Sequence, residues 1–270
     1  MPQFRQAVLH NVGSLNNTLL DMLPVILFRR LLQSMSLVSL SQGEVVHEPD
    51  QQLQHVYFPT TSIVSLNYMM NNGGSPELAV VGNEGMIGVQ AILGGLSMPN
   101  SAIVQRSGLA YRLNRDIFLQ EFERTGGRRC GALQKVLLRY AQALFTQLAQ
   151  FTVCNSHHSV HRRLSRWILM GVDRTLNNEL TVTHDQIAGQ LGVRREGVTA
   201  ALGKLHGSGL LQCSRGQIAV LDRVGLEGEA CECYQVIKSE YDRLLTAFPA
   251  QLHRSNVSPL IHSAGIGLAA

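Results

Sequence analysis

The stretch from Thr183 to Leu205, THDQIAGQLGVRREGVTAALGKL, predicts two short helices joined by a glycine turn. The Thr183 hydroxyl can cap the amide of Gln186 while the Gln186 side chain reaches back, which is a capping box. Gly192 lies where the chain must reverse direction, and the small Ala188 lets two helices cross closely. Each helix has one apolar face at helical spacing, made by Ile187, Ala188 and Leu191 in the first and by Val193, Val198, Ala201, Leu202 and Leu205 in the second. We therefore predict a helix-turn-helix.

The opposite face of the second helix is polar and gathers near its N-terminus. It carries Arg194, Arg195, Glu196, Thr199 and Lys204. In the major groove of DNA, Arg can pair with guanine O6 and N7, and Glu can accept a hydrogen bond from cytosine N4. The charges alone would also suit an ordinary solvated helix pair. The cap, the small residue, the turn glycine and the buried faces together favour a recognition helix.

A tight hairpin is predicted directly after these helices. Leu211–Cys213 and Gln217–Leu221 have strand character, and Ser214–Gly216 separates them. A helix-turn-helix followed by a small hairpin is a winged helix. Arg215 at the tip is placed to contact a phosphate, a contact that positions a protein without reading sequence.

The whole chain has 270 residues, of which 45% are hydrophobic and 16% charged. These values are typical of a soluble globular protein with room for two cores. No apolar run approaches the roughly 20 residues of a membrane span, and the N-terminus lacks the features of a secretion signal. We expect a cytoplasmic protein with no membrane partner.

The positive charge is concentrated in the segment that carries the predicted winged helix. Residues 156–223 hold 9 Lys and Arg against 5 Asp and Glu, whereas residues 224–270 hold 3 against 5. This distribution indicates a nucleic-acid partner. The excess is modest, so a solvated basic face stays open as an alternative.

The N-terminal half predicts helices and then many short strands. Leu15–Gln33 has the pattern of two short helices, with Pro24 starting the second. Short strands separated by turn residues argue for an antiparallel barrel or sandwich; they are Leu37–Leu40, Val45–His47, His55–Phe58, Ile63–Met69, Leu78–Val81, Ala102–Gln105 and Leu109–Leu113. The interval Asn83–Pro99 interrupts them with a long loop and a short helix.

A long helical pattern follows from Asp116 to Phe151. Its apolar residues recur at nearly heptad spacing: Leu133, Val136, Leu137, Tyr140, Leu144 and Leu148. A helix of about 25 residues would span nearly 40 Å. Its stripe must be buried either on the chain's own barrel or on a second copy. Because helix-turn-helix proteins usually act as two-fold dimers, we predict the second copy and hence a homodimer.

The order of barrel, long helix and winged helix resembles the Crp/Fnr family of bacterial transcription regulators over about residues 16–223. The segment Val193–Val198 is similar to the family's Ser-Arg-Glu-Thr-Val run, so the resemblance implies base contacts by Arg195 and Glu196. The family's second base-reading Arg falls on Ala200, a departure that argues against the family's familiar target sequence.

The nucleotide cassette of the family is altered in this chain. Gly88–Ile92 and Asn100–Val104 align with its two ends, so that the resemblance places an effector pocket at Gly88, Val89, Asn100 and Ser101. Val89 replaces the Glu that holds the ribose, and Asn100 replaces the Arg that pairs with the phosphate. Loss of a charge-assisted phosphate contact costs several kcal/mol, so we predict no useful binding of cyclic AMP. The family's N-terminal cysteine cluster is missing, because the first cysteine is Cys130.

Other groups of reactive residues suggest no catalytic or metal site. His157 and His161 are an i, i+4 pair beside His158, but only Cys154 is near in sequence to complete a metal set. Cys231 and Cys233 on a helix would point to different faces, and a disulfide between them would be strained. We expect reduced thiols, no cofactor and no metal. No arrangement of an enzyme active site is recognisable.

The expected fold is α+β, with an N-terminal antiparallel β-roll or jelly-roll barrel, a long dimerisation helix and a C-terminal winged helix-turn-helix. The expected parts are a sensor barrel at 16–115, the dimerisation helix at 116–154, the DNA-binding domain at 155–223, and a C-terminal acidic helix and poorly ordered tail at 224–270. The expected function is sequence-specific regulation of transcription, with double-stranded DNA, a second copy and RNA polymerase as partners and an effector of unknown identity. An effector-binding or interaction module whose DNA affinity is incidental is the alternative.

Overall fold

The N-terminal part of the chain folds into two facing antiparallel sheets preceded by two short helices. In this computed structural model, residues 16–71, 73–124, 131–175 and 177–246 are described. The helices are α2 (Thr18–Asp21) and α3 (Val25–Ser34), as predicted around Pro24, which is the N-cap of α3. The strands are β1 (Ser36–Leu40), β2 (Val45–His47), β3 (His55–Pro59), β4 (Ile63–Asn67), β5 (Glu77–Val81), β6 (Ser101–Arg106) and β7 (Gly108–Asn114). Only β4 ends notably earlier than the pattern predicts.

The two sheets enclose a small core and place the long β5–β6 connection on one side. One sheet has the order β1-β7-β3 and the other the order β2-β6-β4-β5. Alternating apolar residues from both sheets meet between them: Leu40, Val64, Val81, Ala102, Val104 and Ala110. The interval between β5 and β6 holds the 3-10 helix η1 (Val89–Leu93). The structure thus confirms the antiparallel barrel with a short helix in its long loop.

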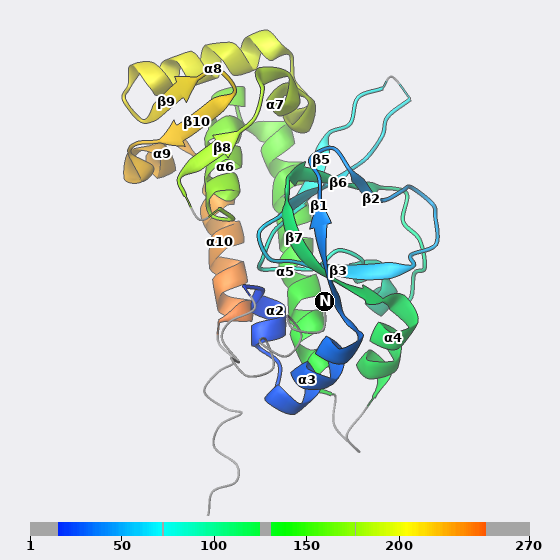
Figure 1. Ribbon diagram of the computed structural model, residues 1–270. Helices are drawn as coiled ribbons and strands as arrows, with labels where there is room; N and C mark the ends of the chain where they lie inside the picture. The colour runs from blue at the N-terminus through cyan, green and yellow to red at the C-terminus, as the bar shows by residue number, and fades with distance from the viewer. Residues whose placement is uncertain (1–15, 72, 125–130, 176, 247–270) are drawn as a thin grey trace, which may run out of the picture.

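The helical region after the sheets consists of two helices, where the sequence pattern suggested one run from Asp116. They are α4 (Arg115–Glu123) and α5 (Ala132–His157). Asn114 caps α4, because its side-chain oxygen accepts hydrogen bonds from the amides of Asp116 and Ile117. Helix α5 has 26 residues, close to the expected length, and lies through the centre of the molecule (Figure 1).

The apolar stripe of α5 packs inside its own chain, so the prediction that this stripe contacts a second copy is wrong. Leu133, Val136, Leu137, Tyr140 and Leu144 are buried, and Leu148 is half-buried. The Tyr140 hydroxyl donates to the carbonyl of Met86 in the barrel at 2.9 Å. The sheets, α4 and the C-terminal helix α10 (Glu232–Leu245) pack on α5. Heptad-like spacing does not indicate which surface covers an apolar stripe, and here that surface belongs to the same chain.

The acidic segment after Leu221 forms two helices, α9 (Arg223–Glu229) and α10, where the sequence suggested one. Helix α10 runs beside α5 (Figure 1). The Tyr241 hydroxyl donates to Gln147 Oε1 at 3.2 Å, and Gln147 Nε2 donates to the carbonyl of Val80 at 3.0 Å. These bonds connect α10 through α5 to the barrel. The predicted tail Pro249–Ala270 lies outside the described residues.

The C-terminal part is a winged helix-turn-helix. Its helices are α6 (Val160–Val172), α7 (His184–Leu191) and α8 (Arg195–Gly207), and its sheet has the order β8-β10-β9. The strands β9 (Leu211–Ser214) and β10 (Gln217–Val220) are the predicted hairpin. The third strand, β8 (Glu179–Thr181), has only 3 residues and was not predicted. Leu164, Trp167, Ile168 and Met170 of α6 are buried in the core of this domain, and Val160 at the start of the helix is half-buried. None of the described helices is both long and apolar enough to cross a bilayer.

Candidate functional site

The turn between α7 and α8 has the local geometry that the sequence predicts. The Thr183 side chain accepts from the Gln186 amide, and the Gln186 side chain accepts from the Thr183 amide, which completes the capping box. Gly192 ends α7 in the left-handed region at φ 61°, ψ 40°, where residues with a Cβ are strained. Ala188 is buried at this crossing and its carbonyl accepts from the amide of Val193 at 3.0 Å. The turn therefore fixes the direction in which α8 leaves α7.

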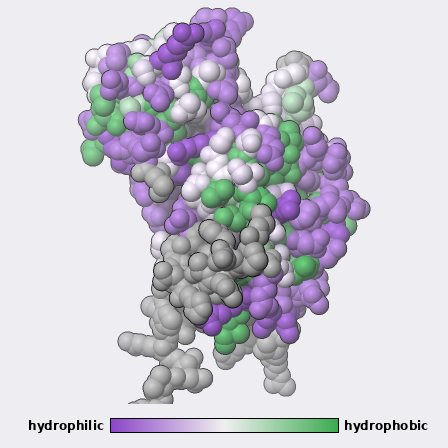
Figure 2. All heavy atoms as spheres, in the orientation of Figure 1, coloured by the Kyte–Doolittle hydropathy of each residue, from purple (hydrophilic) through white to green (hydrophobic). Residues whose placement is uncertain are grey.

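The polar face of α8 is open to solvent. Arg194 is the N-cap of the helix, and Arg194, Arg195, Glu196, Thr199 and Lys204 are all exposed. The apolar face packs inward through Val198, Ala201, Leu202 and Leu205. Figure 2 shows hydrophilic residues at the top of the molecule, where α7 and α8 lie in Figure 1. The structure thus brings these five predicted contact residues onto one accessible surface.

Two residues of α7, which the sequence analysis did not single out, hold side chains of this surface. Arg195 Nη1 lies 3.5 Å from Asp185 Oδ2, and both side chains are largely exposed. The Thr199 hydroxyl lies 3.0 Å from His184 Nδ1. Exposed ion pairs of this kind contribute little to stability, so Arg195 can exchange Asp185 for another partner at low cost. Their place in the first turn of α7, directly after the N-cap Thr183, was their only sequence signal.

The wing presents Arg215 at its tip. β9 and β10 pair antiparallel, with Gln217 opposite Ser214. Gly216 has φ 75°, and its left-handed conformation closes the tight turn. Arg215 is exposed. Arg215 is therefore accessible for the predicted phosphate contact.

The predicted effector residues lie together at the edge of the barrel. Val89 and Asn100 line a cavity of about 80 Å³, together with Leu66, Leu78, Leu93, Met98, Ala141, Leu144, Phe145 and Leu148. Asn100 Nδ2 donates to the carbonyl of Ser101 at 3.4 Å. Gly88 precedes η1 at φ 98°, where an added Cβ would come within 2.9 Å of Leu53. Ligand pockets are typically some 300 to 1,000 Å³, so this apolar cavity is small for a nucleotide.

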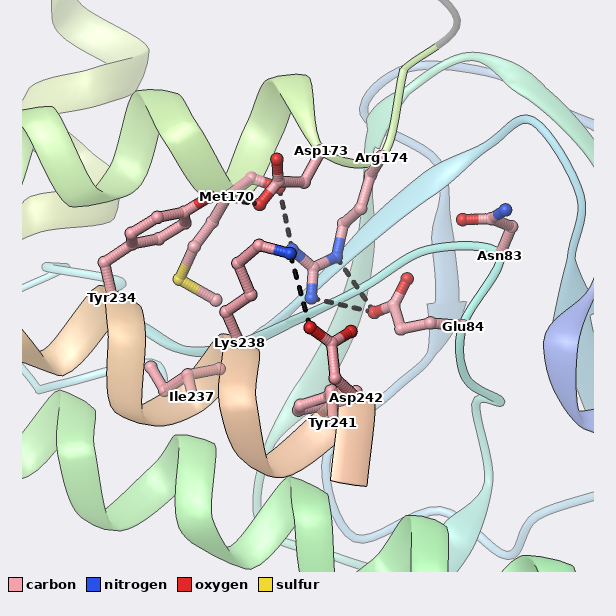
Figure 3. Close-up of a pocket in the computed structure, with 10 residues that line it drawn as sticks. All are labelled: Asn83, Glu84, Met170, Asp173, Arg174, Tyr234, Ile237, Lys238, Tyr241 and Asp242. Carbon is pink, nitrogen blue, oxygen red and sulfur yellow. Dashed lines mark hydrogen bonds and ion pairs between the residues drawn. The ribbon is translucent and has the colours of Figure 1, made fainter. Parts of the chain in front are cut away.

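A polar junction joins the barrel to the winged helix. Arg174, just after α6, places Nη2 2.8 Å from Glu84 Oε1 in the turn after β5, and donates from Nη1 to the carbonyl of Met170 at 2.7 Å. Figure 3 shows the two charged groups facing each other, with Lys238 and Asp242 of α10 beside them. Burial alone would lower the pKa of Arg174, but the Glu84 carboxylate raises it. The junction surrounds a cavity of about 240 Å³.

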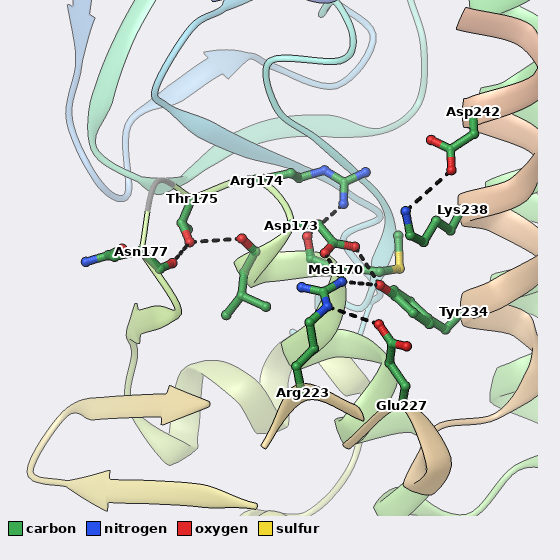
Figure 4. Close-up of polar contacts among 11 residues, drawn as sticks. Met170, Asp173, Arg174, Thr175, Asn177, Arg223, Glu227, Tyr234, Lys238 and Asp242 are labelled. Carbon is green, nitrogen blue, oxygen red and sulfur yellow. Dashed lines mark hydrogen bonds and ion pairs between the residues drawn. The ribbon is translucent and has the colours of Figure 1, made fainter. Parts of the chain in front are cut away.

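A second polar cluster ties α9 and α10 to the same end of α6. Arg223 Nη2 lies 2.5 Å from Asp173 Oδ1 and donates to the Tyr234 hydroxyl at 2.7 Å, while Arg223 Nε donates to Glu227 at 3.0 Å (Figure 4). The Tyr234 hydroxyl in turn donates to Asp173 Oδ2 at 2.9 Å. Burial and the neighbouring Asp173 charge raise the pKa of Tyr234. The end of α6 is therefore fixed from the barrel side and from the C-terminal side.

The structure also brings together four residues that the sequence analysis treated separately. Cys154, His158, Cys231 and Cys233 each place a ligand-capable atom within 4.8 Å of the others. The expectation that Cys231 and Cys233 point to different faces of a helix is wrong, because Cys231 is the extended N-cap of α10 and only Cys233 lies within the helix. His161, which the i, i+4 spacing places beside His157, pairs with Glu229 at 2.7 Å.

Two sequence-family comparisons match the two parts of the chain. The cyclic nucleotide-binding domain matches residues 37–125, and the Crp-like helix-turn-helix domain matches residues 162–229. Together they cover more than half of the chain, in the order typical of one group of transcription regulators. The chain belongs to the Crp/Fnr family. It is thus a transcription regulator of this type with a helix-turn-helix DNA-binding domain, and neither match indicates an enzymatic domain.

Solved structures of Crp/Fnr proteins have the same fold. FixK2 from Bradyrhizobium japonicum is 16% identical with a TM-score of 0.63, covering 73% of this chain and 98% of its own. A putative regulator of the Crp/Fnr family from Eubacterium rectale is 17% identical with a TM-score of 0.60, covering 78% and 96%. A CRP-family regulator from Thermus thermophilus is 18% identical with a TM-score of 0.59, covering 72% and 96%. No curated protein matches the chain. These similarities support the architecture described above.

Proposed function

We propose that this Crp/Fnr protein acts in the cytoplasm as a homodimer that binds a near-palindromic operator through α8 and makes contact with RNA polymerase. The observation that carries the proposal is the exposed first turn of α8, where Arg195 and Glu196 are open to solvent and Arg195 contacts the equally exposed Asp185. In this motif the N-terminal residues of the recognition helix contact base edges. We assign Arg195 and Glu196 to bases, Arg194, Thr199 and Lys204 to flanking contacts, and Arg215 to phosphate.

The proposed dimer uses the face of α5 that the chain leaves open. Leu138, Phe145 and Val153 are exposed, at 44%, 59% and 46% of full residue accessibility. No charged residue occurs between Tyr140 and Ser156. A solvated helix face usually carries charges, so this uncharged face supports contact with a copy of itself. The apolar stripe from Leu133 to Leu148, on the opposite side of α5, packs on the protein's own core and holds the helix in place.

The DNA contacts are tested by selecting bound genomic fragments and comparing two arginine variants on the resulting operator. Arg195→Ala is expected to cost about 1 to 3 kcal/mol and to relax specificity at one position. Arg215→Ala is the matched control, because loss of a phosphate contact weakens binding to all sequences and reduces the salt slope by about 1. Equal losses for all duplexes in Arg195→Ala would refute its base-reading role. Retention of a specific operator against competitor DNA at moderate salt separates the regulator from the alternative of a module with incidental DNA affinity.

We further propose that the protein does not respond to cyclic AMP. Val89 and Asn100 line the cavity in place of the family's Glu and Arg, and the space beside them is about 80 Å³. Titration calorimetry with cyclic AMP should give no heat of binding at micromolar concentrations. Low-micromolar affinity would refute this part of the proposal and leave the DNA-binding part intact.

A further inference from the structure

The four-residue cluster at the connection between α5 and α6 has the composition and spacing of a metal centre. Cys154 lies near the end of α5 and His158 is the C-cap of that helix, while Cys231 and Cys233 lie at the start of α10. The Sγ atoms of Cys154 and Cys231 are 3.4 Å apart, and Cys233 Sγ is 3.7 Å from His158 Nδ1. All four ligand atoms lie within 4.8 Å of one another. Cys-x-x-x-His and Cys-x-Cys thus meet from segments far apart in the chain.

These distances correspond to one ion in tetrahedral coordination. Metal–sulfur distances near 2.3 Å place two ligands of a tetrahedron about 3.8 Å apart. The observed separations are close to this value, and a small movement would bring the wider ones to it. A cluster of several irons needs its ligands farther apart than a single ion does. A disulfide between Cys154 and Cys231 would instead shorten their contact to about 2.05 Å and leave Cys233 and His158 without a role.

The surroundings of His158 are those of a metal-bound imidazole. While Nδ1 faces the thiols, Nε2 lies 3.3 Å from Glu232 Oε1. Metal-ligating histidines almost always donate the other ring N–H to a carboxylate, a carbonyl or water, which fixes the tautomer and the ring orientation. The neighbouring Cys231 and Cys233 bracket Glu232 in sequence, so one short segment supplies two ligands and the supporting carboxylate.

The charge nearby suits thiolates. Arg166 of α6 is 1% exposed, its guanidinium stacks 3.8 Å over the Phe151 ring, and none of the ion pairs among the described residues includes it. Its positive charge lies close enough to act on the sulfurs of Cys154 and Cys231. Three thiolates and one neutral imidazole around a divalent ion carry one net negative charge. The buried Arg166 cation offsets that charge.

We propose that Cys154, His158, Cys231 and Cys233 bind one Zn²⁺ ion in a closed tetrahedral Cys₃His site. Four protein ligands leave no open position, so the site is structural. It holds the start of α10 against the connection between α5 and α6. This proposal does not depend on which operator or effector the protein recognises. The plain alternative, a cluster of small apolar side chains, accounts for three buried thiols but not for the imidazole and its carboxylate.

The proposal is tested on the full chain purified with reductant and without chelator. Elemental analysis should give one zinc per chain, and replacement by Co²⁺ should give the intense visible bands of tetrahedral Co²⁺ with thiolate charge-transfer bands. Alkylation mapped by mass spectrometry should show that zinc protects Cys154, Cys231 and Cys233. Cys213 on β9 is half-buried outside the cluster, so it should react equally with and without zinc.

Matched variants keep the test independent of folding. Cys233→Ser should abolish retention of stoichiometric zinc, and Cys213→Ser should retain it. Because Cys233→Ser could unfold the chain, Glu232→Gln is the second variant: its side chain is 69% exposed, and loss of the supporting carboxylate should weaken zinc binding on the order of 10- to 100-fold with the fold intact. His157→Gln, one residue from the ligand, should bind zinc as the unaltered chain does.

Three results would overturn the proposal. One is a folded protein without metal whose alkylation pattern is the same with and without added zinc. Another is a Cys154–Cys231 disulfide in place of metal. The last is iron with acid-labile sulfide, which would replace a single ion by a cluster.

Discussion

Replacing Arg174 by Met should destabilise the protein substantially, because it leaves Glu84 without its cation in a mostly buried junction. Arg174 makes two contacts with Glu84 Oε1, from Nε at 2.9 Å and from Nη2 at 2.8 Å, and one with the Met170 carbonyl. The side chains are 7% and 18% accessible. Met preserves most of the aliphatic volume, so the change removes mainly the charge and the three donated bonds.

The magnitude follows from the burial of the pair. Removing one partner of a buried ion pair costs roughly 3 to 5 kcal/mol, since the other charge stays buried without compensation. The adjacent cavity of about 240 Å³ and the partial exposure of Glu84 allow water to reach the carboxylate. We therefore expect the lower end, about 3 kcal/mol. Lys238→Met is the matched control, because Lys238 and Asp242 are 3.4 Å apart and 40% and 61% accessible. Exposed pairs contribute only about 0 to 1 kcal/mol.

The assay is urea unfolding followed by the fluorescence of Trp167 and by circular dichroism. Trp167 is the single tryptophan and lies 6% exposed in α6, close in sequence to the junction. The double variant Arg174→Met with Glu84→Gln should recover part of the loss, since no charge is then left unpaired. If Arg174→Met costs no more than Lys238→Met, or if the double variant recovers nothing, the pair does not hold the barrel to the winged helix.

Two further predictions follow from the described geometry. Phe145→Glu places a charge on the open face of α5 and should shift the sedimentation equilibrium toward monomer with little change in the fold. Ile26→Glu, at a position 78% exposed on α3, is the control and should leave the dimer unchanged. A dimer that tolerates Phe145→Glu would exclude this face as the dimer interface. Gly192→Ala should destabilise the protein by about 1 to 2 kcal/mol in urea unfolding, because φ at this residue is 61°. The cost comes from the backbone and not from a clash, since the atom nearest to an added Cβ is an ordinary 3.6 Å away. Gly203→Ala at an exposed position of α8 should instead stabilise the protein by about 0.5 to 1 kcal/mol, and equal effects at the two glycines would contradict the left-handed turn.

The helix-turn-helix and the polar face of α8 could be predicted from sequence because their signals are local. Thr183 and Gln186 are three residues apart, and Gly192 acts on its own backbone. The polar and apolar faces of α8 follow from helical periodicity alone. The same holds for the short strands of the barrel, where turn residues mark both ends of each strand. The structure confirms these features with small changes of boundary.

Features that depend on distant packing could not be predicted in this way. The sequence does not show what covers the stripe of Leu133 and Tyr140, because nothing local to α5 indicates that α10 and the barrel pack on it. Cys154 and Cys231 are separated by 77 positions, and their meeting depends on how α10 packs against α5. The side chain of Cys231 can lie beside that of Cys233 only because α10 begins at Glu232, directly after it. The first residue of a helix is among the least reliable features to predict from a sequence pattern.

Helix α6 is the element through which the barrel and the proposed DNA-contacting surface are connected. Just after its C-terminus, Arg174 binds Glu84 of the barrel, while its buried face packs on α7 and α8. The cysteine cluster lies on the other side, at the connection that precedes α6. A helix fixed at both ends moves as a rigid body, so a displacement of the Glu84 turn changes the orientation of α8 rather than being absorbed in a flexible linker. We therefore expect any signal received by the barrel to reach DNA through the Glu84–Arg174 contact, and Arg174→Met to reduce operator affinity more than Lys238→Met even in solutions where both variants are fully folded.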